Sequence, residues 1–230
     1  MSYKDPKRKV GSQSEIPSID EDTNIITVKG YQNFTINKSS LDINAKSKFE
    51  KINKVISEFK DYNSFCDIGC SAGIVSILAY KNNFKNIVSI DHDQEYITIL
   101  NKLINKLNIT YINTKIESFG IDKNTYDIVF CGAIIHWIWS LTSNYSSFEE
   151  IFKYLSSITN NILLIEWISE HDNAIKGFGH ITKNKQNYTT ANFNNSIGKY
   201  FKLLKIIELD GATRILYVAE KYHHQLIHMV

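Results

Sequence analysis

The sequence predicts an α/β fold: a doubly wound, mostly parallel sheet of seven strands with helices on both faces and an antiparallel closing hairpin. Three observations predict it. Short, almost continuously apolar segments alternate with segments whose apolar residues recur at helical spacing. A glycine-rich turn joins one such strand to its helix, and the last two strand-like segments are joined by Asp210-Gly211. Continuously apolar strands are typical of parallel sheets that helices cover on both faces.

Size and composition narrow the class of protein. A chain of 230 residues fits one domain with a substantial core. A net charge of +2 is too small to indicate nucleic acid or a membrane surface as the partner. Three cysteines favour a reducing compartment over a disulfide framework, and no apolar run approaches the roughly 20 residues of a membrane span. These properties predict a cytoplasmic protein.

The first elements are short. Residues 1–22 are charged and carry both prolines of the chain, which predicts a mobile N-terminal arm. The stretch "NIITVKGYQNFTI" predicts one or two short strands around Gly30, and a helical pattern begins at Ala45. We expect the folded domain to span 23–222 and residues 223–230 to form a tail.

Strand and helix signals then alternate to the end of the chain. The last predicted helix opens with Ser147 and Glu150 at the spacing of a capping box. The predicted strands are 64–68, 86–91, 109–113, 126–135 and 161–167, the predicted helices are 73–83, 94–109 and 146–159, and the hairpin pairs 199–209 with 213–222.

The glycine-rich turn "DIGCSAG" favours a ligand without a polyphosphate. Gly69 and Gly73 allow close approach of the backbone to a ligand. The dinucleotide fingerprint G-x-G-x-x-G needs its second glycine at the position of Ser71, and no Gly-Lys-Ser/Thr follows for a phosphate loop. Asp67, at the strand end, would repel an anion and suits a cationic ligand.

A second acid suggests what else the ligand carries. Asp91 ends the next predicted strand, 22 residues after Gly69. An acid at this spacing is placed to accept hydrogen bonds from ribose hydroxyls. S-adenosylmethionine (SAM) fits this description of a ligand with a ribose and a positive charge but no polyphosphate.

The stretches "CDIGCSAGIVSILA" and "VSIDHD" resemble the first two motifs of the class I SAM-dependent methyltransferases, and the resemblance spans 64–167. It implies a Rossmann-like fold, SAM as the cofactor and S-adenosylhomocysteine (SAH) as its product. Lys115 departs from the family pattern, which commonly has an acid there. The resemblance implies that Asp67, Gly69 and Gly73 frame the methionine end, that the Cys70 N–H lies in the loop, that Asp91 holds the ribose, that His92 and Ile116 flank the adenine, and that Glu117 or backbone holds the adenine amine.

A narrower resemblance concerns the acceptor. The segment 132–167, with His-Trp after the fourth strand and Glu-Trp closing the fifth, is similar to methyltransferase domains found with surface-glycan biosynthesis in bacteria and large DNA viruses. It implies O-methylation of a sugar hydroxyl on a glycan or its precursor. It also implies that the chain is a segment of, or a partner to, a glycosyltransferase.

Methyl transfer to a hydroxyl needs a base near the acceptor. His136 directly follows the predicted strand 126–135, and Glu166 ends the strand 161–167 at the same sheet edge. His180, in a long polar stretch after that strand, is an alternative base. For each residue a structural or solvated role is the competing interpretation.

Acceptor-binding candidates lie at the same edge. Aromatic faces stack on sugars, so Trp137 or Trp167 is predicted to line the acceptor site, with core packing as the alternative for each. Arg214 is predicted to bind an anionic group of the acceptor or to form a salt bridge. We expect no required metal, because the cysteines form no paired C-x-x-C motif and His224 and His228 have no carboxylate beside them.

Three other functions stay open on the sequence. A nucleic-acid methyltransferase would need a basic face, which the small net charge disfavours. A small-molecule methyltransferase and a SAM-binding scaffold without catalysis are the remaining alternatives.

Overall fold

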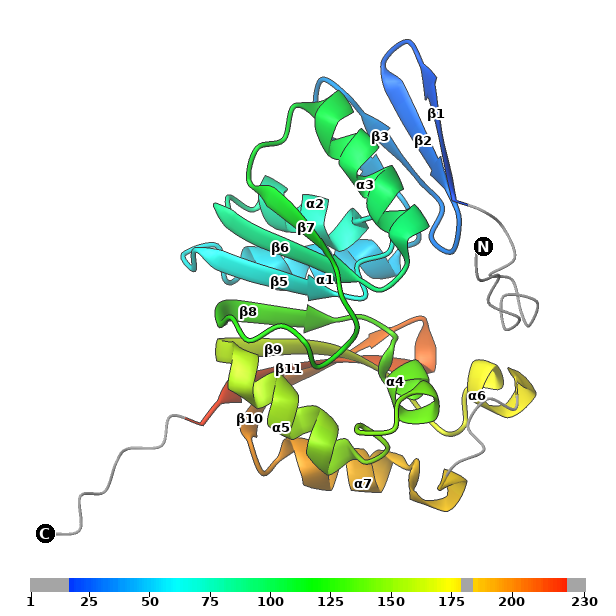
Figure 1. Cartoon of the computed structure of the whole chain (residues 1–230), viewed down its shortest axis with the longest axis vertical. Helices are drawn as coiled ribbons and strands as arrows, with labels where there is room; N and C mark the ends of the chain where they lie inside the picture. The colour runs from blue at the N-terminus through cyan, green and yellow to red at the C-terminus, as the bar shows by residue number, and fades with distance from the viewer. Residues whose placement is uncertain (1–16, 179–183, 223–230) are drawn as a thin grey trace, which may run out of the picture.

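The computed structural model, which describes residues 17–178 and 184–222, confirms the predicted α/β fold (Figure 1). Its main sheet has seven strands, of which the first five in the chain run parallel. In sheet order the strands are β10 (Phe201–Leu209), β11 (Gly211–Lys221), β9 (Thr159–Ile168), β8 (Tyr126–Cys131), β5 (Ser64–Ile68), β6 (Asn86–Asp91) and β7 (Ile112–Ile116).

The strand order reverses at β5. Its neighbours are β6 on one side and β8 on the other, both parallel to it, and Asp67 pairs with Ser89 and with Phe130. In such sheets ligands bind beyond the carboxyl ends of the strands at the reversal point. The segments that follow β5, β6 and β8 therefore form the expected site.

The predicted closing hairpin is confirmed. Strand β10 pairs antiparallel with β11, and β11 pairs antiparallel with β9. Gly211 turns the chain with a φ of 80°. Because β11 runs opposite to β9, its first residues lie at the same sheet edge as the carboxyl end of β9: Arg214 pairs with Ile168.

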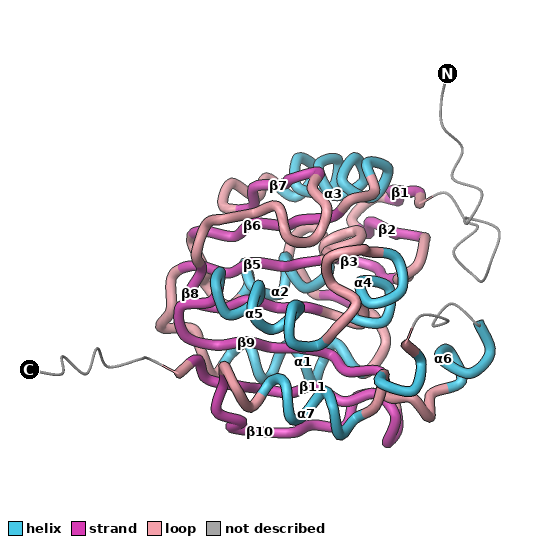
Figure 2. Tube along the Cα trace, turned by 60° about the horizontal axis from the view of Figure 1, so that its bottom comes forward, coloured by secondary structure: helices cyan, strands magenta, loops and turns pink. Residues whose placement is uncertain are grey.

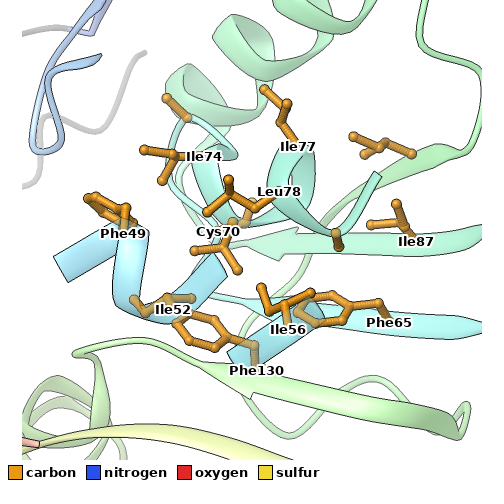
Figure 3. Close-up of a cluster of buried hydrophobic side chains, with 14 of the residues drawn as sticks. Phe49, Ile52, Ile56, Phe65, Cys70, Ile74, Ile77, Leu78, Ile87 and Phe130 are labelled. Atoms are coloured by element: carbon orange, nitrogen blue, oxygen red, sulfur yellow. The ribbon is translucent and has the colours of Figure 1, made fainter. Parts of the chain in front are cut away.

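Helices cover both faces of the sheet (Figure 2). One hydrophobic cluster packs α1, α2 and α3 on one face, and a second packs α4, α5 and α7 on the other. Figure 3 shows the first cluster between α1, α2 and the strands. Among the described helices, none is both long and apolar enough to cross a membrane. The helices are α1 (Lys48–Ser57), α2 (Ile74–Lys81), α3 (Gln94–Leu107), α4 (Ile135–Leu141), α5 (Phe148–Ile158), α6 (Asn173–Phe178) and α7 (Thr190–Ile197).

A second, antiparallel sheet precedes the main one and was not predicted as such. Its strands are β1 (Ser18–Asp22), β2 (Ile25–Lys29), β3 (Phe34–Asn37) and β4 (Ile43–Asn44). Its apolar side chains join the cluster around α1, α2 and α3. Strand β1 corrects the predicted boundary of the arm at residue 22, because residues 18–22 pair with β2; the exposed Glu21 forms salt bridges with Lys38 and Lys106.

Two further segments differ from the prediction. The strand predicted to reach residue 135 ends at Cys131, since Ala133 turns the chain with a φ of 53° and α4 begins at Ile135. The polar stretch after β9 contains α6, a short 3-10 helix (Lys185–Asn187) and α7. Thr189 caps α7 by accepting from the Asn192 N–H, so local capping stabilises a helix with only two buried apolar residues.

Candidate functional site

The turn between β5 and α2 has a left-handed backbone at Gly69, Ser71 and Gly73, with φ of 72°, 51° and 83°. A Cβ on Gly69 would lie 2.7 Å from Ile134, and one on Gly73 would lie 2.3 Å from Leu100. The two glycines are therefore required by backbone conformation and by protein packing.

The amides of the turn are satisfied by β6. Gly69 and Cys70 donate to the Ile90 carbonyl at 2.8 and 3.1 Å, and the Ser71 N–H donates to the Asp91 carboxylate at 2.9 Å. The Cys70 N–H is thus not available to a ligand, contrary to the prediction. Its side chain is buried in the cluster of Figure 3, and burial raises the pKa of the thiol. A turn with satisfied amides does not cradle phosphate, in agreement with the prediction from Ser71.

Asp91 connects the turn to the next loop. One carboxylate oxygen accepts from the Ser71 N–H and the other from the Asp93 N–H, both at 2.9 Å. Each oxygen retains a second lone pair for a ribose hydroxyl. The neighbouring His92 is 80% exposed and its Nδ1 lies 3.3 Å from Asp91.

The residues predicted for the adenine follow β7. Glu117 donates its backbone N–H to the Asp91 carbonyl at 3.1 Å, and Ile116 is 53% exposed although apolar. Lys115 pairs with Asp122 at 3.0 Å. The structure thus brings Ile116 and Glu117 beside Asp91. Lys115 instead forms a salt bridge with Asp122.

Two buried oxygens test whether SAM fits these residues. Ser71 Oγ and Glu117 Oε2 are buried and have no hydrogen-bond partner among the described residues. Buried polar atoms nearly always have partners, and both residues donate a backbone N–H to Asp91. The two oxygens flank Asp91, the residue predicted to bind the ribose. The amine and hydroxyl groups of SAM would supply the hydrogen-bond donors that these oxygens lack, so the site fits the cofactor. Ser71 was not predicted as a site residue, although its place in the turn could have indicated it.

Asp67 does not face the site. It is 1% exposed and accepts from Ser76 Oγ at 2.7 Å, and Ser89 Oγ donates to Ser76 Oγ at 2.7 Å. Burial raises its pKa to about 7. The predicted contact with the methionine end is therefore replaced by a polar link that ties β5 to α2 and β6.

His136 lies where the sequence placed it, just after the carboxyl end of β8, in the first turn of α4. It is 4% exposed, and its ring centroid is 5.2 Å from that of Trp137. Trp137 is half-buried, so it remains a candidate for the acceptor wall. His180, His224 and His228 lie outside the described residues.

Glu166 has a partner that the sequence did not reveal. Lys48 Nζ, on α1, lies 3.0 Å from both carboxylate oxygens of Glu166, and the two side chains are 7% and 2% exposed. The carboxylate predicted to orient a sugar hydroxyl or to raise the basicity of a histidine is thus one half of a buried ion pair. No local pattern pointed to Lys48, which is 118 residues away in the chain.

Trp167 corrects a second prediction. It is fully buried, stacks on Phe193 at 4.3 Å between ring centroids, and donates its indole N–H to Thr190 at 3.1 Å. Its neighbours come from α7 and the main core, so it does not line an acceptor site.

Arg214 forms the salt bridge that was one of its two predicted roles. Its Nε and Nη2 contact the two carboxylate oxygens of Asp172 at 3.1 and 3.3 Å. Tyr31, in the turn between β2 and β3, is 38% exposed and lies near the Arg214 and Glu166 side chains; partial burial and the Glu166 carboxylate raise the Tyr31 pKa. An open cleft of about 730 Å³ lies beside the pair, lined by His171, Asp172, Asn173, Ala174, Asp210, Thr213 and Arg214.

The cysteines and acids form no metal centre in the part of the chain that the structure describes: no three His, Cys, Asp or Glu side chains gather there as ligands. Cys66, Cys70 and Cys131 are free and buried.

Comparisons with known proteins agree with this geometry. Residues 65–157 match the family model described as a methyltransferase domain. No curated protein matches the chain at a significant level.

Solved structures share the fold at low identity. The N-methyltransferase NodS from Bradyrhizobium japonicum WM9, in complex with SAH, is similar with a TM-score of 0.59 and 10% identity, over 77% of this chain and 89% of that one. Magnesium protoporphyrin IX methyltransferase from Synechocystis PCC 6803 with bound SAH gives 0.59 and 12%, over 76% and 84%. The 16S rRNA methylase RmtB gives 0.56 and 10%, over 76% and 62%. Because these names give different acceptors, the shared fold leaves the acceptor of this chain open.

Proposed function

We propose that the chain, whose residues 65–157 match the model of a methyltransferase domain, transfers a methyl group from SAM to a hydroxyl group of a carbohydrate acceptor, a glycan or its precursor. The observation that carries the cofactor half is the group around Asp91. The acceptor half is supported by the sequence resemblance and by the polar groups at the carboxyl ends of β8, β9 and the start of β11.

The cofactor half rests on three groups. Asp91 offers its carboxylate to the ribose, Glu117 Oε2 is a buried acceptor placed for the adenine amine, and Ser71 Oγ is a buried hydroxyl in the turn. The exposed Ile116 supplies an apolar surface for the adenine. When bound, SAM supplies a methyl group on a positively charged sulfur, and its transfer to an acceptor oxygen forms SAH and releases the hydroxyl proton.

His136 is the proposed base. It follows the carboxyl end of β8, and an imidazole has an ordinary pKa near neutrality, which suits proton acceptance from a hydroxyl. Its 4% exposure and the neighbouring Trp137 ring exclude most water. Glu166 is paired with Lys48, so it positions α1 against β9 and does not accept the proton of the acceptor hydroxyl. The protein is proposed to work in the cytoplasm as a segment of, or a partner to, a glycosyltransferase.

The test is SAH release from SAM across a panel of methyl hexosides, 6-deoxyhexosides, nucleotide sugars, RNA, DNA and a small phenol. We expect turnover with a sugar. Turnover on RNA or DNA alone would contradict the carbohydrate acceptor, and SAM binding in calorimetry without any turnover would favour a scaffold.

The variant His136→Gln tests the base. Its amide retains hydrogen bonding but does not accept a proton, so we expect kcat to fall about 10²–10⁴-fold while the Kd for SAM stays within threefold of the wild type. An unchanged kcat would exclude His136 as the base.

A further inference from the structure

The cleft beside Arg214 lies at the edge of the sheet that carries the proposed reaction. Strand β9 separates β11 from β8, and neighbouring strands are about 4.8 Å apart. Arg214 pairs with Ile168, three residues beyond Ile165, which pairs with Cys131 at the end of β8. Two strand spacings across and three residues along therefore place Arg214 about 14 Å from the end of β8, which leads to His136. An extended arginine side chain, an acceptor ring and the His136 side chain together span that distance.

Asp172 has no capacity left for a ligand. One carboxylate oxygen accepts from Arg214 Nη2 at 3.3 Å and from the Ala174 N–H at 2.8 Å. The other accepts from Arg214 Nε at 3.1 Å and from Thr213 Oγ1 at 2.7 Å. A carboxylate offers about four lone-pair sites, so the four donors fill every acceptor site of Asp172. Its negative charge is compensated by Arg214.

Arg214 does keep donors. A guanidinium carries five N–H groups. Two of them donate to Asp172, and Tyr31 lies nearby, so at least two remain for a ligand. The positive charge itself is compensated, since Asp172 binds it through both oxygens.

The rest of the lining adds no free positive charge. Asp210 is exposed at the rim of the cleft, and His171 lies 3.9 Å from Glu170. An anionic ligand would meet the Asp210 carboxylate and a guanidinium that Asp172 already neutralises. A neutral ligand rich in oxygen atoms would accept from the remaining N–H groups without that repulsion.

We propose that this cleft binds the acceptor and that the Asp172–Arg214 pair makes it select an uncharged, hydroxyl-rich ring over its anionic counterpart. Arg214, whose charge Asp172 compensates, donates hydrogen bonds to ring or hydroxyl oxygens, and Asp172 positions it. The inference rests on the proposed function, because it specifies the charge of that acceptor.

The test uses two glycosides with one ring: methyl β-D-glucopyranoside and methyl β-D-glucuronopyranoside. Binding to the SAH-loaded protein is measured by calorimetry, and turnover by SAH release from SAM. We expect the wild type to bind the neutral ring at least tenfold more tightly than the uronide. Tighter binding of the uronide, or binding of neither glycoside, would overturn the inference.

The variant Asp172→Asn gives the sharper result. It leaves an amide that still contacts Thr213 but frees the charge of Arg214, so the uronide-to-neutral ratio of affinities rises at least tenfold. Asp210→Asn is the matched control: it removes the same charge from the rim without touching the pair, and the ratio changes less than threefold. Equal changes in both variants would overturn the role of the pair.

If Asp172→Asn fails to fold, Arg214→Lys decides. Lysine keeps the charge and loses the planar fork, so the Kd for the neutral glycoside rises at least tenfold while the Kd for SAH is unchanged. An unaltered glycoside Kd contradicts the proposal. Binding of the neutral ring without turnover would support the cleft as its binding site and contradict methyl transfer to this class of acceptor. Failure of the cleft proposal and failure of the proposed function therefore give different results.

Discussion

At the scale of single residues, Asp67 couples stability to pH. Its buried carboxyl has a pKa of about 7, raised chiefly by burial, against an ordinary value of 3.8. Between these two values the folded state holds a proton that the unfolded state has released. Stability therefore falls as pH rises from about 4 to about 7 and then levels off.

The variant Asp67→Asn isolates this effect. The amide is neutral at every pH and still accepts from Ser76, so we expect the free energy of unfolding to lose its decline between pH 5 and pH 8. The wild type should lose a few kcal/mol over that range relative to the variant. Urea unfolding at both pH values measures the difference, and parallel pH profiles would contradict it.

Gly73 makes a second prediction at this scale. Alanine there meets both a left-handed backbone and Leu100, whereas alanine at Gly211 meets a left-handed backbone with nothing within 4 Å. We expect Gly211→Ala to cost about 1–2 kcal/mol and Gly73→Ala about 1–3 kcal/mol more, from overpacking. Urea unfolding of the two variants measures the difference, and equal losses would mean that Leu100 moves aside freely.

At the scale of elements, the Lys48–Glu166 pair joins α1 to β9. Removing one partner leaves an unpaired buried charge, so Lys48→Met or Glu166→Gln should each cost about 3–5 kcal/mol. The double variant Lys48→Met with Glu166→Leu should be more stable than either single variant, as measured in urea.

Turnover of that double variant separates two roles of Glu166. If the carboxylate only positions α1 and β9, the stable double variant keeps most of its kcat. Loss of kcat in a stably folded double variant would restore Glu166 as a participant in proton transfer.

The strands and helices were predictable because each depends on local pattern. The strand ending in Glu166-Trp167 was correct, yet both side-chain roles came out differently. Successive residues of a strand face opposite sides: Glu166 meets Lys48 on one face, and Trp167 meets Phe193 on the other. Both partners are far along the chain, so no local signal names them.

Some elements were missed for a related reason. Strand β1 is highly charged and α7 is polar, so neither has the apolar pattern that predicts a strand or helix. Asp91 was located correctly because the acid and the turn it braces are both marked in the sequence at a fixed spacing. No sequence pattern around Asp172 indicates its partner. Arg214 comes close to Asp172 only because β11 pairs with β9.

At the scale of the molecule, ligand binding should stabilise the whole fold. A ligand that binds only the folded state at about 100 times its Kd adds roughly 2.7 kcal/mol, which for a domain of this size raises the Tm by roughly 5–10 °C. We expect SAH to produce such a shift in a thermal melt. NAD should produce none, because the amides of the turn are satisfied by Ile90 and Asp91.

The control for the melt is Asp91→Asn, whose single amide oxygen keeps one of the two backbone contacts of the carboxylate and weakens acceptance from a ribose, so its shift is measured against the Tm of the ligand-free variant. Its SAH-induced shift should be less than half that of the wild type. A shift with NAD, or an equal shift in the variant, would contradict the assignment of the cofactor site.

The buried Lys48–Glu166 pair also bears on how this sequence can diverge. A lineage that loses one charge first passes through a protein weakened by several kcal/mol, a large part of the total stability of a typical domain. Drift at either position alone should therefore be rare, and the two positions should change together. Relatives of this chain should carry either both charges or an apolar pair, and mixed states should be scarce among them.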